Sequence, residues 1–173
     1  MSGGRVSLSQ VMTVRGSGAT VFHGAMIYMT TTQALGAASG TAVFDTVHND
    51  SDGYFSGGHI VIPTGLGGRY TIAGQLALSA SEGAAGNGTI WETYISVGSS
   101  RAANNRISSL VGGGNPIQIM PVATTAYVLA DGDAIYLVCN TFGGTPANVS
   151  ISGVTDFAAY VSFLSLHRIG DAP

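Results

Sequence analysis

The residues best placed for chemistry are two carboxylates, Asp50 and Asp52, which stand just before Gly53. Alternate carboxylates followed by a glycine can converge on one hard cation, as they do in calcium-binding loops. A bidentate glutamate would complete such a loop, but that position is occupied by His59. We therefore interpret the segment as a solvated turn and predict no metal site. Asp50 and Asp52 are kept as candidate calcium ligands.

The remaining reactive side chains do not form a recognisable active site. The four histidines lack the i, i+4 spacing of a helical metal-binding pair, and only two glutamates could serve as an acid and base pair. A phosphate-binding loop would require a lysine, which the chain does not contain. The single cysteine, Cys139, lies in an apolar run and is expected to be a small buried hydrophobe. We expect no enzymatic activity and no cofactor.

Three aromatic residues in expected loops offer ligand recognition as an alternative to catalysis. The rings of Tyr54, Phe55 and Phe142 could stack on the sugar ring of a receptor glycan. They could also pack against the ends of a β-sandwich, and we favour this second interpretation. The three residues are kept as candidate receptor contacts.

The composition favours self-association over binding to nucleic acid or membranes. Charged residues make up 9% of the chain, against about a quarter in ordinary soluble proteins. Such a neutral surface gives little electrostatic protection against association. The arginines are dispersed and the net charge is -3, so we expect no surface that binds nucleic acid. No run approaches the roughly 18 apolar residues of a membrane helix, and we expect neither membrane insertion nor a secretion signal.

From residue 25 onward, short β-rich runs alternate with clusters of Gly, Asn, Asp, Pro and Ser, which predicts an all-β fold. Residues 69–79 and 89–97 alternate between apolar and polar positions, as expected for half-buried strands. Residues 25–29, 134–139 and 157–166 are apolar at both odd and even positions. One face of an antiparallel sheet normally meets water, so the second face of these strands must be covered by another layer or by a neighbouring subunit. We expect the neighbouring subunit, because no helices are predicted that could form another layer.

These doubly apolar runs supply the predicted subunit interface. Its members are Ile27, Met29, Ile135, Leu137, Phe157, Val161 and Phe163. Residues 1–24 differ in kind, because they are rich in Ser, Gly and Thr with isolated apolar positions. We interpret them as an arm that docks on a neighbouring chain through Val6, Leu8, Val11 and Val14.

Several ordered segments carry a resemblance to a known family. They are residues 41–46 (TAVFDT), 50–55 (DSDGYF), 60–65 (IVIPTG), 68–72 (GRYTI), 129–137 (LADGDAIYL) and 168–170 (RIG). Together they resemble the jelly-roll family that includes tumour necrosis factor (TNF) and the globular head of the first complement component, in the version common among phage structural proteins. The resemblance covers about residues 25–170.

The resemblance implies a two-sheet antiparallel jelly-roll sandwich that forms a homotrimer, with residues 25–173 as the trimerisation domain. It also implies that the first strand, the last strand and the strand after Gly132 and Asp133 share an inner sheet around a threefold axis. The arm is neither collagen-like nor a heptad stalk, so a complement-like triple helix is excluded.

The same resemblance implies a structural protein on the virion surface. Our leading expectation is a capsid decoration or cement protein, whose trimers sit on the phage head while residues 1–24 contact the major capsid protein or another virion protein. The alternative is the receptor-binding domain of a tail fibre or head fibre, which would bind a host glycan.

Overall fold

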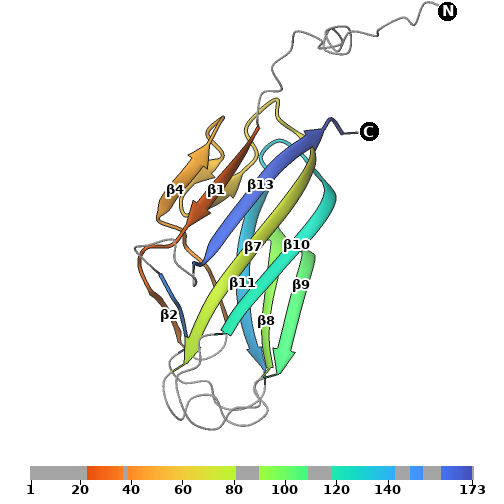
Figure 1. Cartoon of the computed structure of the whole chain (residues 1–173). Coiled ribbons are helices and arrows are strands. Elements are labelled where there is room, and N and C mark those ends of the chain that lie inside the picture. Colours follow the sequence, from red (N-terminus) through yellow and green to blue (C-terminus); the bar gives the residue numbers. More distant parts are fainter. Residues whose placement is uncertain are drawn as a thin grey trace, which may run out of the picture.

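The computed structural model describes residues 23–36, 39–80, 90–108, 118–142, 149–153 and 161–172. Over these ranges the chain forms two antiparallel sheets that pack face to face (Figure 1). The predicted all-β sandwich is confirmed. The predicted arm residues Val6, Leu8, Val11 and Val14 lie outside the described residues, as does Phe157.

The first sheet has seven strands. They are β1 (Gly24–Tyr28), β2 (Gln33–Gly36), β4 (Thr46–Asp50), β7 (Gly68–Ala80), β10 (Gln118–Leu129), β12 (Val149–Ile151) and β13 (Phe163–Gly170). The central order is β10, β7, β13, β1 and β4, with β12 pairing the end of β7 and with β2 at the edge. The first and last described strands therefore share a sheet, as the resemblance implied, and they are direct neighbours in it.

The second sheet has six strands. They are β3 (Ser39–Thr41), β5 (Phe55–Ser56), β6 (His59–Val61), β8 (Ile90–Val97), β9 (Ser100–Ser108) and β11 (Ala134–Phe142). Their order is β5, β6, β11, β8 and β9, and β3 also pairs with β11. The strand after Gly132 and Asp133 is β11, so the expectation that it shares a sheet with β1 and β13 is wrong.

The long strand β7 shows how the sequence pattern builds the core. Tyr70, Ile72 and Leu76 all point inward and are fully buried, as their alternation predicted. Gly74 lies on the same inward face, where an added Cβ would stand 3.0 Å from Cδ2 of Leu137 on β11. Glycine at this position therefore allows the two sheets to approach closely.

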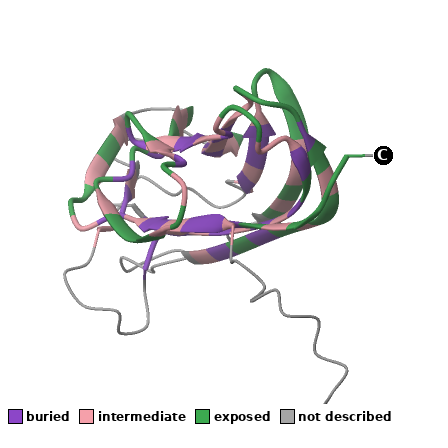
Figure 2. Cartoon of the chain, turned by 90° about the horizontal axis from the view of Figure 1, so that it is seen from above, coloured by how far each residue is buried: buried purple, intermediate pink, exposed green. Residues whose placement is uncertain are grey.

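Four of the predicted interface residues lie inside the core of the single chain. Ile27 and Met29 are 0% and 1% exposed, and Ile135 and Leu137 are both 0% exposed. All four belong to one hydrophobic cluster between the two sheets, where buried segments of both layers face each other (Figure 2). The prediction that they contact a second subunit is therefore wrong, because the sandwich uses these faces to form its own core.

The other described interface residues lie at the start of the last strand. Val161, just before β13, is 7% exposed, so little of its side chain is available to a partner. Phe163 is half-buried, and its neighbour Leu164 is the residue that enters the core. Phe163 therefore faces away from the core, as an interface residue must.

Two turns, one at the end of the motif segment 60–65 and one within the motif segment 129–137, are joined by one carboxylate. Asp131 accepts hydrogen bonds from the backbone N–H groups of Gly65 and Gly67, each at 2.7 Å. Gly65 and Gly132 both have a φ of 82°, which is the left-handed region that favours glycine. The turn before β11 is thereby fixed against the turn before β7.

Candidate functional surfaces

The outward face of the seven-stranded sheet carries two rows of uncharged side chains. Across β1, β13, β7 and β10, the rows are Tyr28, Phe163, Gln75 and Pro121, then Met26, Ser165, Ala73 and Ala123. Pro121 and Ala123 are exposed, and the other six side chains are half-buried in the single chain. None of the eight carries a formal charge at neutral pH.

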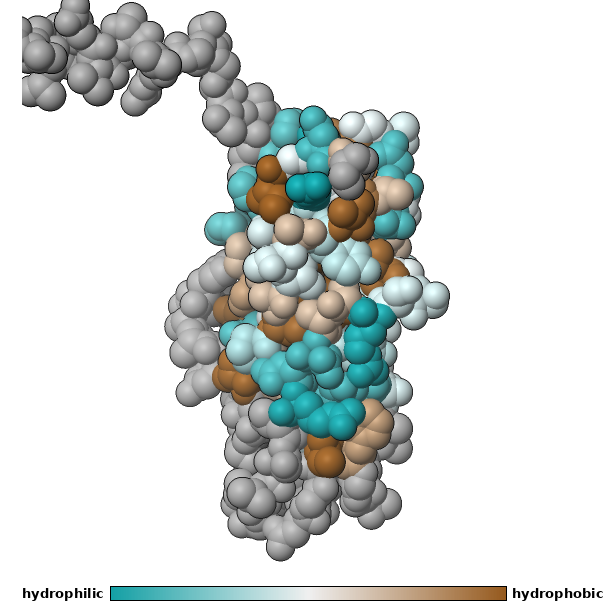
Figure 3. Space-filling view, turned by 90° about the vertical axis from the view of Figure 1, so that its right-hand side faces the viewer, coloured by the Kyte–Doolittle hydropathy of each residue, from teal (hydrophilic) through white to brown (hydrophobic). Residues whose placement is uncertain are grey.

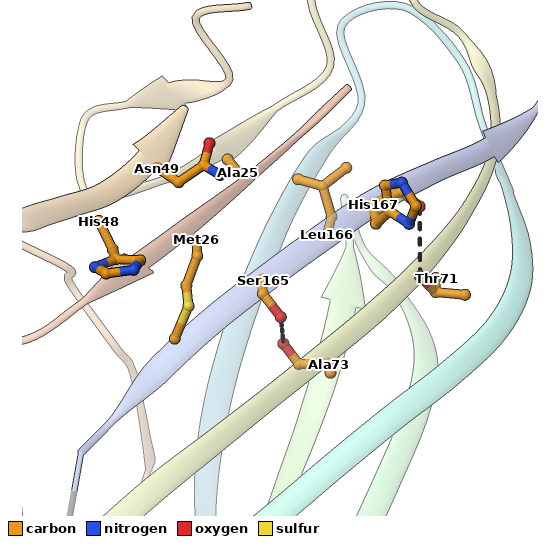
Figure 4. A pocket seen from close by; sticks show the side chains of 9 residues that line it. All are labelled: Ala25, Met26, His48, Asn49, Thr71, Ala73, Ser165, Leu166 and His167. Atoms are coloured by element: carbon orange, nitrogen blue, oxygen red, sulfur yellow. Dashed lines mark hydrogen bonds between the residues drawn. The ribbon is translucent and has the colours of Figure 1, made fainter. Parts of the chain in front are cut away.

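A shallow hollow of about 320 Å³ lies on this face, over β4, β1, β13 and β7 (Figure 4). The Ser165 hydroxyl donates to the Ala73 carbonyl at 3.2 Å, and the Thr71 hydroxyl donates to the His167 carbonyl at 3.4 Å. These hydroxyls are thus engaged by their own sheet. His48 and His167 lie on opposite sides of the group, and no carboxylate lines the hollow.

The two candidate calcium ligands have other roles. Both Asp50 oxygens accept backbone N–H groups: Gly53 and Tyr54 at 2.9 and 2.8 Å on Oδ1, and Phe55 at 3.0 Å on Oδ2. Asp50 therefore closes the loop between β4 and β5, as expected for a turn residue. Within the described ranges, no three His, Cys, Asp or Glu side chains gather in a metal-binding arrangement.

Asp52 pairs with His23, the residue just before the first strand. Its Oδ2 lies 2.9 Å from Nδ1 of His23, and the Ser51 hydroxyl donates to the same oxygen. The hydrogen bond from Ser51, followed by the contact with His23, lowers the pKa of Asp52. The carboxylate therefore holds His23 in place beside the loop that follows β4.

The three candidate receptor aromatics have different surroundings. Tyr54 is 0% exposed, and its ring meets Tyr70 edge-on with their hydroxyl oxygens 3.3 Å apart. Tyr54 is therefore excluded as a receptor contact, and the favoured interpretation, packing within the sandwich, is confirmed for this residue. Phe55 is partly buried and packs against the same core. Phe142 is 41% exposed at the end of β11, so it remains available.

A buried carboxylate on the six-stranded sheet was not anticipated. Glu92 is a polar position in the alternating pattern of β8, yet its side chain is 0% exposed. Arg101 and Arg106 donate to its Oε1 at 2.7 and 3.3 Å, and the Asn104 amide donates to the same atom at 3.0 Å. Asn140 donates to Oε2 at 3.4 Å. We call these five residues the Glu92 cluster.

The charge of Glu92 is maintained by its partners. Burial alone would raise the pKa of this carboxyl, but the hydrogen bond from Asn104 and the charges of Arg101 and Arg106 outweigh it and lower the pKa. The pairing of β8 with β9 places Arg106 directly opposite Glu92. The strands β8 and β9 follow each other in the sequence and pair as a hairpin. Predicting the register of that hairpin from the sequence could have revealed the pairing of Glu92 with Arg106.

Comparison with known proteins bears on the fold. No family model matches the chain, and no curated protein matches it. Among solved structures, the TNF protein Eiger from S. frugiperda superposes with a TM-score of 0.50 at 16% sequence identity. The match covers 88% of this chain and 95% of the Eiger chain. The fold is a TNF-like jelly roll. At this identity the likeness concerns the fold alone.

Within the TNF-like jelly roll, the motif residues serve the architecture. Phe44 and Tyr54 are core residues, and Asp45 accepts the backbone N–H groups of Thr30 and Thr31 at 2.8 and 2.9 Å.

Cys139 is fully buried, as expected, and burial raises its pKa to about 12. No helix in the described part of the chain is long and apolar enough to span a membrane.

Proposed function

We propose that this chain is a non-enzymatic structural subunit of a phage particle, most simply a decoration or cement protein on the head, and that it acts as a homotrimer. The observation that carries the proposal is the pair of uncharged rows at the centre of the outward face of the seven-stranded sheet. The sequence resemblance to phage structural proteins supports the location on the virion surface.

The physical case for the interface rests on desolvation. Burying a neutral, half-apolar sheet face costs little, whereas burying an unpaired charge is strongly unfavourable. The two central rows offer such a face through Met26, Phe163 and Ala73, and the hydroxyl of Ser165 already has a protein partner. The interface is therefore proposed on the outward residues of β1, β13, β7 and β10, with Phe163 kept from the sequence prediction.

The interface can be tested by placing a charge in the centre of this face. We expect the wild-type chain to scatter light as a particle of three times 17.5 kDa. Ala73→Arg should shift the particle to the monomer mass, since three guanidiniums would be buried around one axis. Ser100→Arg, at an exposed position on β9, is the control and should leave the trimer intact. A wild-type monomer, or an Ala73→Arg trimer, would contradict the proposed interface.

The location can be tested on whole particles. Antibodies raised against the purified chain should label the heads of the phage that encodes it in electron micrographs. A chain lacking residues 1–24 should lose binding to undecorated heads if the predicted arm contacts the shell. Unlabelled particles would overturn the virion proposal.

A receptor-binding role at a tail or head fibre is the second candidate, and the exposed Phe142 favours it. Labelling confined to fibres would support this role over head decoration. The partner would then be a host glycan in place of the major capsid protein.

A further inference from the structure

The outward face of the six-stranded sheet presents an ordered array of planar polar and aromatic groups. Across β11, β8 and β9 its rows are Tyr136, Ser96 and Arg101, then Val138, Tyr94 and Asn104, then Asn140, Glu92 and Arg106. Phe142 follows at the end of β11, and the His59 ring stacks on Tyr136 with centroids 4.6 Å apart. Strand β9 lies on the side of the molecule shown in Figure 3, where strongly hydrophilic side chains gather in the lower half of the view.

The Glu92 cluster holds two guanidiniums in fixed positions. Arg101 and Arg106 each give one nitrogen to the same oxygen of Glu92. Arg101 also lies over the Tyr94 ring at 4.1 Å from its centroid, and Arg106 lies 5.1 Å from that of Phe142. Their side chains remain 43% and 53% exposed, so other N–H groups are open to a ligand.

The face has a net positive charge on an acidic molecule. Glu92, Arg101 and Arg106 are the only acidic or basic residues in β8, β9 and β11, which gives two positive charges against one negative. The whole chain carries -3. Because Glu92 is buried beneath its partners, a ligand that approaches this face meets the guanidiniums and not the carboxylate.

The amides beside the guanidiniums add hydrogen-bond acceptors. Asn104 and Asn140 each use the side-chain nitrogen on Glu92, which turns that end of the amide inward. The Oδ1 atom of each amide is an acceptor suited to a hydroxyl group. Phe142 offers a 41% exposed ring at the edge of the array. An acidic sugar presents a carboxylate, hydroxyl groups and an apolar ring face. This surface offers N–H donors for the carboxylate, acceptors for the hydroxyls and an aromatic ring for the ring face.

We propose that this face binds an acidic polysaccharide, through a uronic or sialic acid unit. The sugar carboxylate binds the outer N–H groups of Arg101 and Arg106, its hydroxyls bind Asn104 and Asn140, and a ring packs against Phe142. Glu92 is a positioning residue that holds both guanidiniums and does not contact the sugar. The site is independent of the trimer proposed above, because it lies on the opposite sheet.

The test is a binding titration of the full chain with polysaccharides of defined charge. Polygalacturonate or polysialic acid should bind, and neutral dextran should not. Arg101→Gln and Arg106→Gln should each weaken binding by about tenfold or more, as expected for the loss of a hydrogen bond to a charged group. Arg15→Gln removes the same charge in the predicted arm and should bind like wild type.

Further variants separate sugar recognition from general attraction to polyanions. Phe142→Leu keeps an apolar side chain and should weaken binding to the acidic polysaccharide, while binding of poly-glutamate should be weak in every variant. Arg101→Lys keeps the charge but not the planar fork, and should bind between wild type and Arg101→Gln. Circular dichroism and thermal unfolding of each variant confirm that the fold is retained.

Three outcomes would overturn the proposed site. The first is no binding of either acidic polysaccharide by the wild-type chain. The second is equal binding of poly-glutamate, which would make the face an acidic-peptide or general polyanion surface. The third is equal loss of binding in Arg15→Gln and Arg101→Gln. The trimer is measured separately by light scattering, so failure of the sugar site and failure of the trimer are distinguishable.

Discussion

At the scale of single residues, three described carboxylates hold loop backbone in place. Asp45, Asp50 and Asp131 each accept at least two backbone N–H groups from loops that precede or follow strands. Such hydrogen bonds satisfy loop donors that no strand partner can reach. The acidic residues that first suggested a cation site are thus used by the fold itself.

Asp45 gives a pH-dependent prediction at this scale. Burial would raise its pKa, but hydrogen bonds from Thr30, Thr31 and Thr46 outweigh that effect and lower the pKa from 3.8 to about 2. The ionised form is therefore stabilised in the folded state. Its contribution is present above about pH 4, the unfolded value, and is lost as the pH falls toward about 2.

We expect Asp45→Asn to lower the free energy of unfolding by about 1.5 kcal/mol at pH 7, the lower end for a hydrogen bond to a charged group because Asp45 is exposed. Chemical denaturation between pH 7 and pH 2 measures this. The gap between wild type and variant should narrow below about pH 4, since both then lack the charge. A constant gap across this range would mean that the charge is not involved.

At the scale of elements, the two sheets depend on one close approach. A Cβ at position 74 would lie 3.0 and 3.1 Å from the terminal carbons of Leu137 and 3.3 Å from the Phe163 carbonyl. We expect Gly74→Ala to destabilise the chain by about 1–3 kcal/mol in denaturant unfolding, the usual cost of overpacking a core. Gly170→Ala, where an added Cβ would meet nothing within 4 Å, is the control and should be near neutral.

A second substitution tests the mechanism of this effect. Leu137→Val shortens the side chain that a Cβ at position 74 would touch. The cost of Gly74→Ala should therefore be smaller in the Leu137→Val background, as a favourable coupling in a double-mutant cycle. Additive costs would indicate that the strain lies elsewhere, for example at the Phe163 carbonyl.

At the scale of the whole molecule, the core is complete in one chain. The buried cluster includes Ile27, Leu76, Ile135 and Leu164, which come from both sheets and need no second subunit. We therefore expect the Ala73→Arg monomer to remain folded and to unfold cooperatively, with the β-sheet circular dichroism of wild type. An unfolded Ala73→Arg chain would show that folding and association are inseparable.

The outward faces of the two sheets have different proposed roles, self-association for one and ligand binding for the other. The seven-stranded sheet presents uncharged rows suited to burial, and the six-stranded sheet presents the Glu92 cluster with two partly exposed guanidiniums. A trimer formed through the first face would leave the second face on its outside. Self-association and ligand binding can therefore occur together, on opposite sides of one sandwich.

The sequence by itself determined the all-β class and the inward face of β7, and it supplied the glycines at positions 65 and 132 where the turns form. These features are local, because a period of two assigns residues to faces and glycine permits a positive φ wherever it occurs. The sequence motifs also indicated the TNF-like jelly roll, which the match to Eiger supports.

The tertiary structure alone decided which face of each strand meets the core and which sheet contains each strand. The sequence showed that β1 and β11 are apolar on both faces, but it could not assign Ile27, Ile135 and Leu137 to the core of the same chain. It also could not show that Glu92 is buried, because the covering groups come from Arg101 and Arg106 on one neighbouring strand and Asn140 on another. The reason is that alternation separates two faces of a strand, while only pairing between distant segments decides what covers each face.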